Sequence, residues 1–111
     1  MNKKEYKKYQ KDRKEIYNIT RRLYYLLRNH KDSIYFQKIH GGIYGYYERG
    51  TEEIHIDYRR EIIPTLIHEA LHKWHPEWSE TKVLREESRI VNALSSRQIK
   101  NILKAIGECS T

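Results

Sequence analysis

The chain of 111 residues has little of what marks secreted or membrane proteins. Its only cysteine is Cys109, which excludes an internal disulfide and fits a reducing, cytoplasmic compartment. It lacks a run of 18 or more apolar residues, so we expect neither a transmembrane helix nor a membrane partner. The charged N-terminus also lacks the apolar segment of a secretory leader.

Internal repeats and low-complexity linkers are absent from the sequence as well. Hydrophobic residues make up 38% of the chain and charged residues 33%, a balance typical of soluble proteins. A chain of this length supports one hydrophobic core. We therefore expect a single domain spanning residues 1–111.

The excess of positive over negative charge lies in the N-terminal region. The whole chain has a formal net charge of +7, and residues 1–30 contain ten Lys or Arg against three Asp or Glu. Apolar and tyrosine residues recur there at helical spacing: Tyr6, Tyr9, Ile16, Tyr17, Thr20, Leu23, Tyr24 and Leu27. Residues 1–30 are therefore predicted to form a basic amphipathic helix. A solvated face is the ordinary reading of such charge, and an electrostatic footprint for nucleic acid or anionic membrane is the alternative. Because no RNA-binding motif or paired-cysteine zinc finger accompanies it, we expect weak, non-specific nucleic-acid binding at most.

The middle of the chain is typical of β-strands. Residues 33–39 and 43–48 are rich in β-formers, and Gly41-Gly42 between them suggests a turn. Residues 52–58 alternate polar and apolar side chains, as a half-buried strand does. Two hairpins would join these segments into a three-stranded antiparallel sheet.

The most informative stretch is His68-Glu69-Ala70-Leu71-His72. On a helix, residues four apart lie on one face, so His68 and His72 can bind one zinc ion. Glu69 lies one step round the helix, where its carboxylate can reach metal-bound water. This HExxH pattern is the signature of zinc peptidases.

Two prolines bound the motif helix. Pro64 suits its first turn, and Pro76 predicts an end at Trp74 or His75. One apolar stripe is expected to face the core: Ile63, Ile67, Ala70, Leu71 and Trp74.

A catalytic zinc ion needs a third protein ligand. His75 lies about 10.5 Å along the axis from His68, too far for both to bind one ion, so we expect it at the helix end or cleft wall. No histidine follows it, which leaves a downstream carboxylate unless an earlier residue folds back. Residues 80–94 form an amphipathic helix with Glu87 at the centre of its apolar face. We rank Glu87 first as ligand, then Glu80, then Glu86, with a salt bridge as the ordinary alternative for Glu87.

A last helix is expected after a capping box formed by Ser95 and Gln98, and Gly107 suits its C-terminal end. The expected fold is therefore α+β, with an N-terminal helix, a three-stranded antiparallel sheet, the HExxH helix, the glutamate helix and a C-terminal helix.

This arrangement resembles the minigluzincins, which are minimal single-domain relatives of the gluzincin metallopeptidases. The resemblance implies a minimal zincin-like domain that binds zinc through His68, His72 and Glu87, with Glu69 as general base and acid. It also implies a substrate strand along a sheet edge and zymogen-like latency. Many gluzincins place an acidic residue four positions after the glutamate ligand to orient a histidine, but this chain has Val91 there. Glu80 and Asn92 are possible substitutes.

The expected function is that of a zinc-dependent endopeptidase that hydrolyses peptide bonds with metal-activated water. The partner is then a peptide or protein, along strand 43–48 or 52–58, and His75 or a tyrosine could stabilise the oxyanion. Latency would come from residues 1–12, which could act between copies of a homo-oligomer, or from residues 108–111, with Cys109 as a zinc-bound thiolate in the second case.

Two other classes of function stay open. One is a catalytically silent zinc-binding interaction module. The other is a basic nucleic-acid-binding protein whose metal is structural or absent. A DNA–protein crosslink peptidase of the SprT type would combine cleavage with DNA binding, but that family usually takes a downstream histidine as third ligand.

Overall fold

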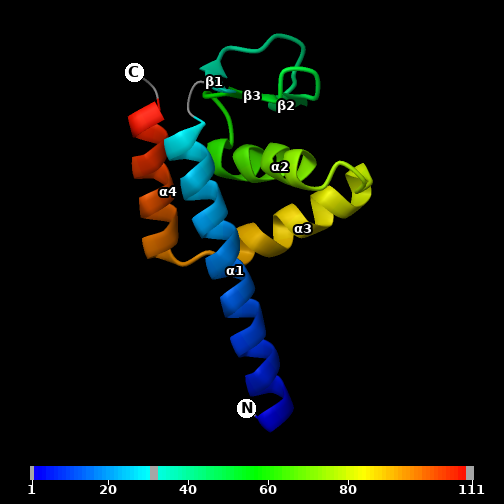
Figure 1. The fold of residues 1–111 in the computed structure, drawn as a ribbon, viewed down its shortest axis with the longest axis vertical. Coiled ribbons are helices and arrows are strands. Elements are labelled where there is room, and N and C mark those ends of the chain that lie inside the picture. Colours follow the sequence, from blue (N-terminus) through cyan, green and yellow to red (C-terminus); the bar gives the residue numbers. More distant parts are fainter. Residues whose placement is uncertain (1, 31–32, 110–111) are drawn as a thin grey trace.

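Four helices and a three-stranded sheet make up residues 2–30 and 33–109, the part of the chain that the computed structural model describes (Figure 1). The elements in chain order are α1 (Lys3–Asn29), β1 (Ile34–Gln37), β2 (Gly45–Glu48), β3 (Glu53–Asp57), α2 (Ile62–Trp74), α3 (Glu80–Ala93) and α4 (Ser96–Cys109). The α+β class and the sequence order of helices and strands are confirmed.

The sheet is mixed, and the prediction of an all-antiparallel sheet is wrong. The strand order is β1-β3-β2, with β1 parallel to β3 and β2 antiparallel to β3. Only the second predicted hairpin, between β2 and β3, exists. Gly41 and Gly42 have positive φ angles of 90° and 75°, but they lie in a connection that carries the chain from one edge of the sheet to the other.

A buried carboxylate holds this connection in place. Asp57, at the end of β3, is only 1% exposed. It accepts a hydrogen bond from the backbone N–H of Ile39 at 3.2 Å, and Arg59 Nη2 lies 2.7 Å from its Oδ2. Arg59 also donates to the carbonyl of Ile39 at 3.2 Å. These contacts fix the chain leaving β1 beside the end of β3, so β1 pairs with β3 rather than with β2.

Strand β2 is an edge strand that lies close to helix α2. A Cβ atom at Gly45 would come within 2.6 Å of Thr65 Cγ2 and 2.7 Å of the His55 carbonyl oxygen. Glycine at this position therefore allows the strand to approach the N-terminal half of α2. Strand β3 is central, so the alternative that residues 52–58 form an exposed sheet edge is wrong. Of the two segments considered for a substrate strand, the one that contains β2, residues 45–48, lies at an edge.

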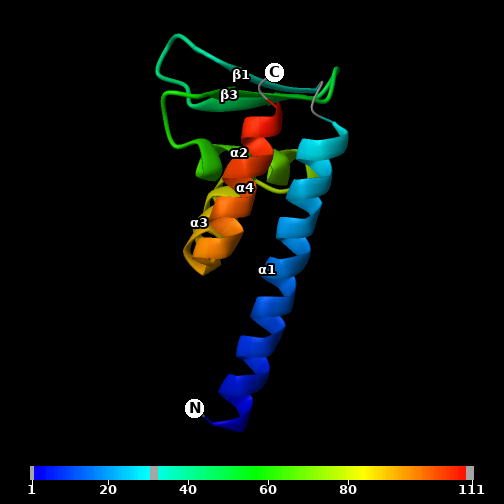
Figure 2. The same ribbon diagram turned by 90° about the vertical axis from the view of Figure 1, so that its left-hand side faces the viewer.

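The core forms where α2 lies between the sheet and the remaining helices (Figures 1 and 2). Ile54 and Ile56 of β3 and Leu66 of α2 are at most 1% exposed. Helices α1, α3 and α4 close the other side of the same cluster with Leu23, Leu27, Val83, Ile90 and Ile102. Residues from every helix and from β1 and β3 thus share one core.

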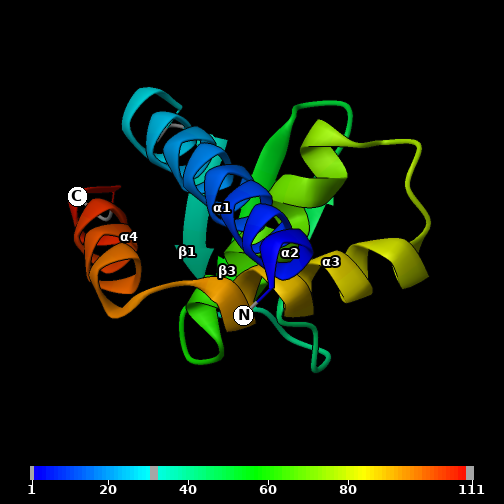
Figure 3. The same ribbon diagram turned by 90° about the horizontal axis from the view of Figure 1, so that it is seen from below.

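Helix α1 confirms the predicted N-terminal helix, but only its second half packs. Its buried residues begin at Ile16, whereas Tyr6 and Tyr9 are 51% and 46% exposed. The first half projects away from the body (Figures 1 and 2) and points toward the viewer in Figure 3. The helical spacing of its tyrosines therefore predicted a packed face that the fold does not cover.

The remaining helices follow their predicted signals with one exception. The Ser95–Gln98 capping box is present, with Gln98 N–H donating to Ser95 Oγ at 3.1 Å. Helix α4 continues past Gly107 to Cys109, so the predicted end at Gly107 is wrong. A glycine within a helix costs only about 1 kcal/mol, which the burial of Ala105 and Ile106 directly before it offsets. Within residues 2–30 and 33–109, no helix is long and apolar enough to cross a bilayer.

The Asp57–Arg59 pair predicts how stability depends on pH. The Arg59 guanidinium, followed by the backbone N–H groups of Arg59 and Ile39, holds the pKa of Asp57 well below its usual range. A carboxyl with a lowered folded-state pKa stabilises the fold above its unfolded pKa of about 4 and loses this contribution as pH falls further. We predict that Asp57→Asn lowers the melting temperature at pH 7 and flattens its decline between about pH 4 and 2.

Thermal unfolding followed by circular dichroism across this pH range measures both effects. Glu108→Gln, which changes an exposed carboxylate, is the control and is expected to keep the parental profile. Equal melting temperatures for Asp57→Asn and the parent at pH 7 would show that Asp57 does not stabilise the sheet.

Candidate metal and catalytic site

Helix α2 presents its two motif histidines side by side. The Nε2 atoms of His68 and His72 lie 3.2 Å apart, and their side chains are 14% and 26% exposed. Two nitrogens bound to one tetrahedral zinc ion at about 2.1 Å each would lie about 3.4 Å apart. The pair is therefore spaced as two ligands of one ion are.

Helix α3 brings a carboxylate to the same two nitrogens. The connection over residues 75–79 is short, so α3 runs back alongside α2 (Figure 1). Glu80, in the first turn of α3, places Oε1 2.8 Å from His68 Nε2 and Oε2 2.8 Å from His72 Nε2. One ligand atom from each of these three residues lies within 4.8 Å of the others. The three residues can together hold a metal ion.

Glu87 contacts the opposite side of the first histidine. Its Oε1 lies 2.8 Å from His68 Nδ1. A carboxylate on the second ring nitrogen orients a metal-binding histidine and fixes its tautomer. The geometry therefore favours Glu80 as the third ligand and Glu87 as the orienting group, the reverse of the ranking from sequence.

The third-ranked glutamate faces elsewhere. Glu86 Oε2 lies 2.7 Å from Arg89 Nε, and Arg89 Nη2 lies 2.6 Å from Glu15 Oε1 on α1. Glu86 thus belongs to an ion-pair network between α1 and α3.

The donor chemistry of the cluster fits a cation. A neutral imidazole has one N–H, and Glu87 Oε1 is placed to accept it from His68 Nδ1. His68 Nε2 then directs a lone pair toward the same point as His72 Nε2 and the Glu80 carboxylate. A divalent ion between these acceptors would satisfy them together, and imidazole and carboxylate are both ligands of zinc.

Glu69 lies beside this cluster in a largely buried position. The residue is 6% exposed, and its Oε1 is 4.0 Å from His68 Nε2. The pKa of Glu69 is raised to about 7, mainly by burial; His68 opposes this shift, and the Glu80 and Glu87 carboxylates contribute to it. A carboxyl with a pKa near neutrality can both accept and release a proton at working pH.

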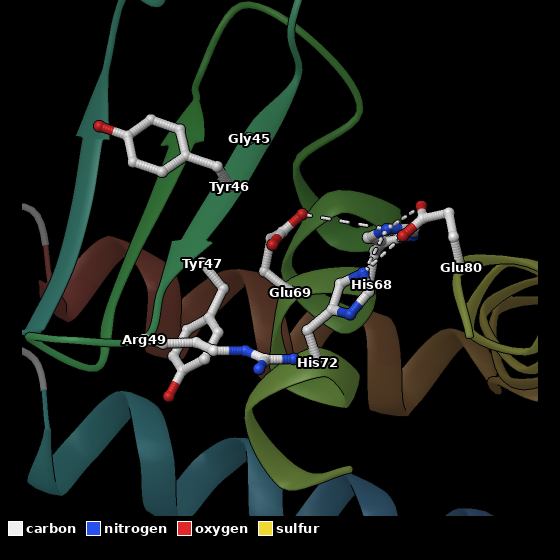
Figure 4. Close-up of a pocket in the computed structure, with 8 residues that line it drawn as sticks. All are labelled: Gly45, Tyr46, Tyr47, Arg49, His68, Glu69, His72 and Glu80. Carbon is white, nitrogen blue, oxygen red and sulfur yellow. Dashed lines mark hydrogen bonds and ion pairs between the residues drawn. The ribbon is translucent and has the colours of Figure 1, made fainter. Parts of the chain in front are cut away.

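A groove runs over Glu69 between strand β2 and helix α2. One part, of about 350 Å³, is lined by Gly45, Tyr46, Tyr47, Arg49, His68, Glu69, His72 and Glu80 (Figure 4). A second part, of about 300 Å³, shares Gly45, His68 and Glu69 and continues past Thr65 and Leu84. The groove therefore extends to both sides of Glu69, as a site for a chain passing through requires.

Arg49 is a groove residue that no sequence motif singled out. It follows β2, and its guanidinium lines the groove near His72 (Figure 4). Its Nη2 donates to the carbonyl oxygen of Pro76 at 3.2 Å. The position of its side chain depends on how β2 packs against α2, which a local sequence motif does not predict.

The other residues singled out from the sequence lie away from the cluster. His75 caps the C-terminus of α2 and stacks on Trp78 with ring centroids 3.8 Å apart, and it does not line the groove. Val91 packs against the core and Asn92 is exposed, so neither orients a histidine. Residues 110–111 and the Cys109 side chain lie outside the described structure, as does Met1 of the proposed 1–12 plug. In the part of the chain that is described, no residue of α1 lines the groove.

Comparison of the chain with protein-family models, with curated proteins and with solved structures gives no match.

The geometry makes a ranked prediction about metal affinity. We expect His68→Ala, His72→Ala and Glu80→Ala each to abolish zinc binding between α2 and α3, because each removes a donor atom. Glu87→Gln should weaken binding by about 10- to 100-fold, the usual effect of losing an orienting partner. Competition with a chromophoric chelator measures the affinity of the tightest site.

Glu86→Gln is the matched control and should bind zinc as the parent does, because Glu86 faces Arg89. Parental affinity in Glu80→Ala together with complete loss in Glu87→Gln would restore Glu87 as the ligand.

Proposed function

We propose that this chain is a zinc-dependent endopeptidase whose metal is held by His68, His72 and Glu80. The observation that carries the proposal is the convergence of two imidazole nitrogens and one carboxylate within 4.8 Å, beside a buried glutamate in an open groove. A site with three protein ligands leaves one position for water or substrate, which distinguishes catalytic from structural zinc. When bound, zinc would supply Lewis-acid chemistry and lower the pKa of water.

The residues around this position have separate tasks. Glu87 holds the His68 ring through Nδ1, so that Nε2 keeps its lone pair on the ligand side. Glu69 is placed to take a proton from the attacking water and deliver it to the leaving amine. Burial beside the ligand set keeps the pKa of the Glu69 carboxyl near 7 and excludes much of the surrounding water.

The edge strand supports a peptide as the substrate. Strand β2 lies at the margin of the sheet and borders the groove through Gly45, Tyr46 and Tyr47. An extended peptide can add to such an edge by main-chain hydrogen bonds. Because the groove continues on both sides of Glu69, the peptide could extend beyond the scissile bond in both directions, which favours internal over terminal cleavage.

Arg49 is the candidate donor for the developing oxyanion. Its guanidinium lines the groove on the side of β2, facing the helix that carries the motif. A fixed cationic donor near the reacting carbonyl stabilises charge that develops in the transition state. Arg49 takes this role in place of His75, whose ring stacks on Trp78.

Latency would require a segment from outside this chain's own fold to block the groove. The N-terminal half of α1 projects away from the body and does not reach the groove of its own chain (Figure 2). A plug formed by residues 1–12 would therefore have to come from a second copy of the chain.

The role of Glu69 separates a peptidase from a silent zinc-binding module. We predict that Glu69→Gln keeps its fold and its zinc but loses peptide cleavage by about 10²- to 10⁴-fold, because the amide cannot carry the proton. Hydrolysis of a fluorogenic peptide library, with zinc content measured on the same samples, gives the test.

Glu108→Gln, which changes an exposed carboxylate near the end of α4 and away from the groove, should cleave like the parent. Equal cleavage by Glu69→Gln and the parent would remove Glu69 from the mechanism. Inactivity of the zinc-loaded parent, with and without residues 1–12, would favour the silent module.

A further inference from the structure

A second histidine site lies on the face of the sheet turned away from α2. Ile54 and Ile56 of β3 are buried in the core beneath the sheet, so His55 between them points to the opposite face. Its ring is held between two cross-strand partners. Tyr35 of β1 stacks on it at 4.9 Å and Tyr46 of β2 at 4.4 Å between ring centroids. The imidazole is therefore fixed in orientation by three adjacent strands.

One ring nitrogen of His55 has an assigned partner and the other does not. Nδ1 lies 3.0 Å from Gln37 Oε1, a carbonyl oxygen that accepts a hydrogen bond. Nδ1 then carries the proton, and Nε2 presents a lone pair. Among the described residues, Nε2 of His55 is the buried side-chain polar atom that has no hydrogen-bond partner.

Two carboxylates face this unpartnered nitrogen. Glu53 Oε1 lies 3.5 Å from His55 Nε2, and Glu48 Oε2 lies 4.0 Å from it. Glu48 and Glu53 are also directly opposite each other in the β2–β3 ladder. Like charges at such positions are destabilising.

We propose that His55 Nε2, Glu48 and Glu53 form a second site for a divalent metal ion of the zinc class. Their ligand atoms lie within 4.8 Å of one another, and the distances of 3.5 and 4.0 Å are close to the separation of about 3.4 Å between ligands of one tetrahedral zinc ion. Gln37 serves as the orienting partner of the histidine. Mixed imidazole and carboxylate ligands select zinc and its neighbours over calcium or magnesium.

The ion would have a structural role. Glu48 ends the edge strand β2, while Glu53 and His55 belong to the central strand β3. A metal bridge between them would fasten β2 to β3, and β2 is the strand whose other face borders the groove. This site does not depend on the proposed peptidase function, because none of its three ligands lines the groove, although Tyr46 contacts both the groove and His55.

The test removes the first site and counts metal at the second. The His68→Ala/His72→Ala chain is dialysed against zinc, and bound metal is measured by mass spectrometry, with circular dichroism to check the fold. We expect about one zinc per chain and a zinc-dependent rise in melting temperature, since an ion that binds only the folded state stabilises it. Adding Glu48→Gln/Glu53→Gln should remove both the bound zinc and the zinc-dependent rise in melting temperature. Glu61→Gln/Glu108→Gln, with the same change in charge at two exposed carboxylates, should leave both intact.

A second comparison works if the His68→Ala/His72→Ala chain does not fold. With an otherwise native chain, His55→Ala or Glu48→Gln should each lower the zinc content by about one equivalent, while His40→Ala, at an exposed loop histidine, should not. Unchanged zinc content in His55→Ala and Glu48→Gln would overturn the proposal and make the cluster an ion pair of protonated His55. Failure of the peptidase would instead appear as absent cleavage with this second equivalent still bound.

Discussion

The placement of His68 between two carboxylates is the interaction on which the rest of the candidate site depends. Glu87 lies 2.8 Å from one ring nitrogen and Glu80 lies 2.8 Å from the other. Both glutamates come from α3, so the arrangement exists only because α3 packs back along α2. The buried residues Val83 and Ile90, one turn from each glutamate, hold that packing. The core thus sets the distance between these side chains.

Features of the fold that depend on local sequence could be predicted. The alternation in 52–58 identified β3, and the capping box of Ser95 and Gln98 identified the start of α4. The parallel pairing of β1 could not be predicted, because it depends on the contact of buried Asp57 with the backbone of Ile39, 18 residues earlier. The exposure of the first half of α1 was missed for a related reason. Its helical periodicity is local, but whether another element covers it is not.

The same distinction applies to the candidate site. Residues four apart on a helix share a face, so the positions of His68 and His72 followed from the motif alone. The roles of Glu80 and Glu87 did not follow from the motif. The argument from burial ranked the less exposed residue first, and the side chain of Glu87 is 20% exposed against 60% for Glu80. The sequence feature that favours Glu80 is the short connection after α2, which keeps the start of α3 near His72. No sequence feature predicted Arg49 as a groove residue, because its position depends on the order of strands in the sheet.

The central claim is that α2 and α3 together hold one zinc ion on the Nε2 side of His68. Anomalous diffraction at the zinc absorption edge, from crystals of the zinc-loaded chain, tests this most directly. The account predicts an anomalous peak about 2.1 Å from His68 Nε2, His72 Nε2 and a Glu80 carboxylate oxygen, with Glu87 still on His68 Nδ1. A peak on the Nδ1 side with Glu87 as ligand, or no peak between the two helices, would contradict it.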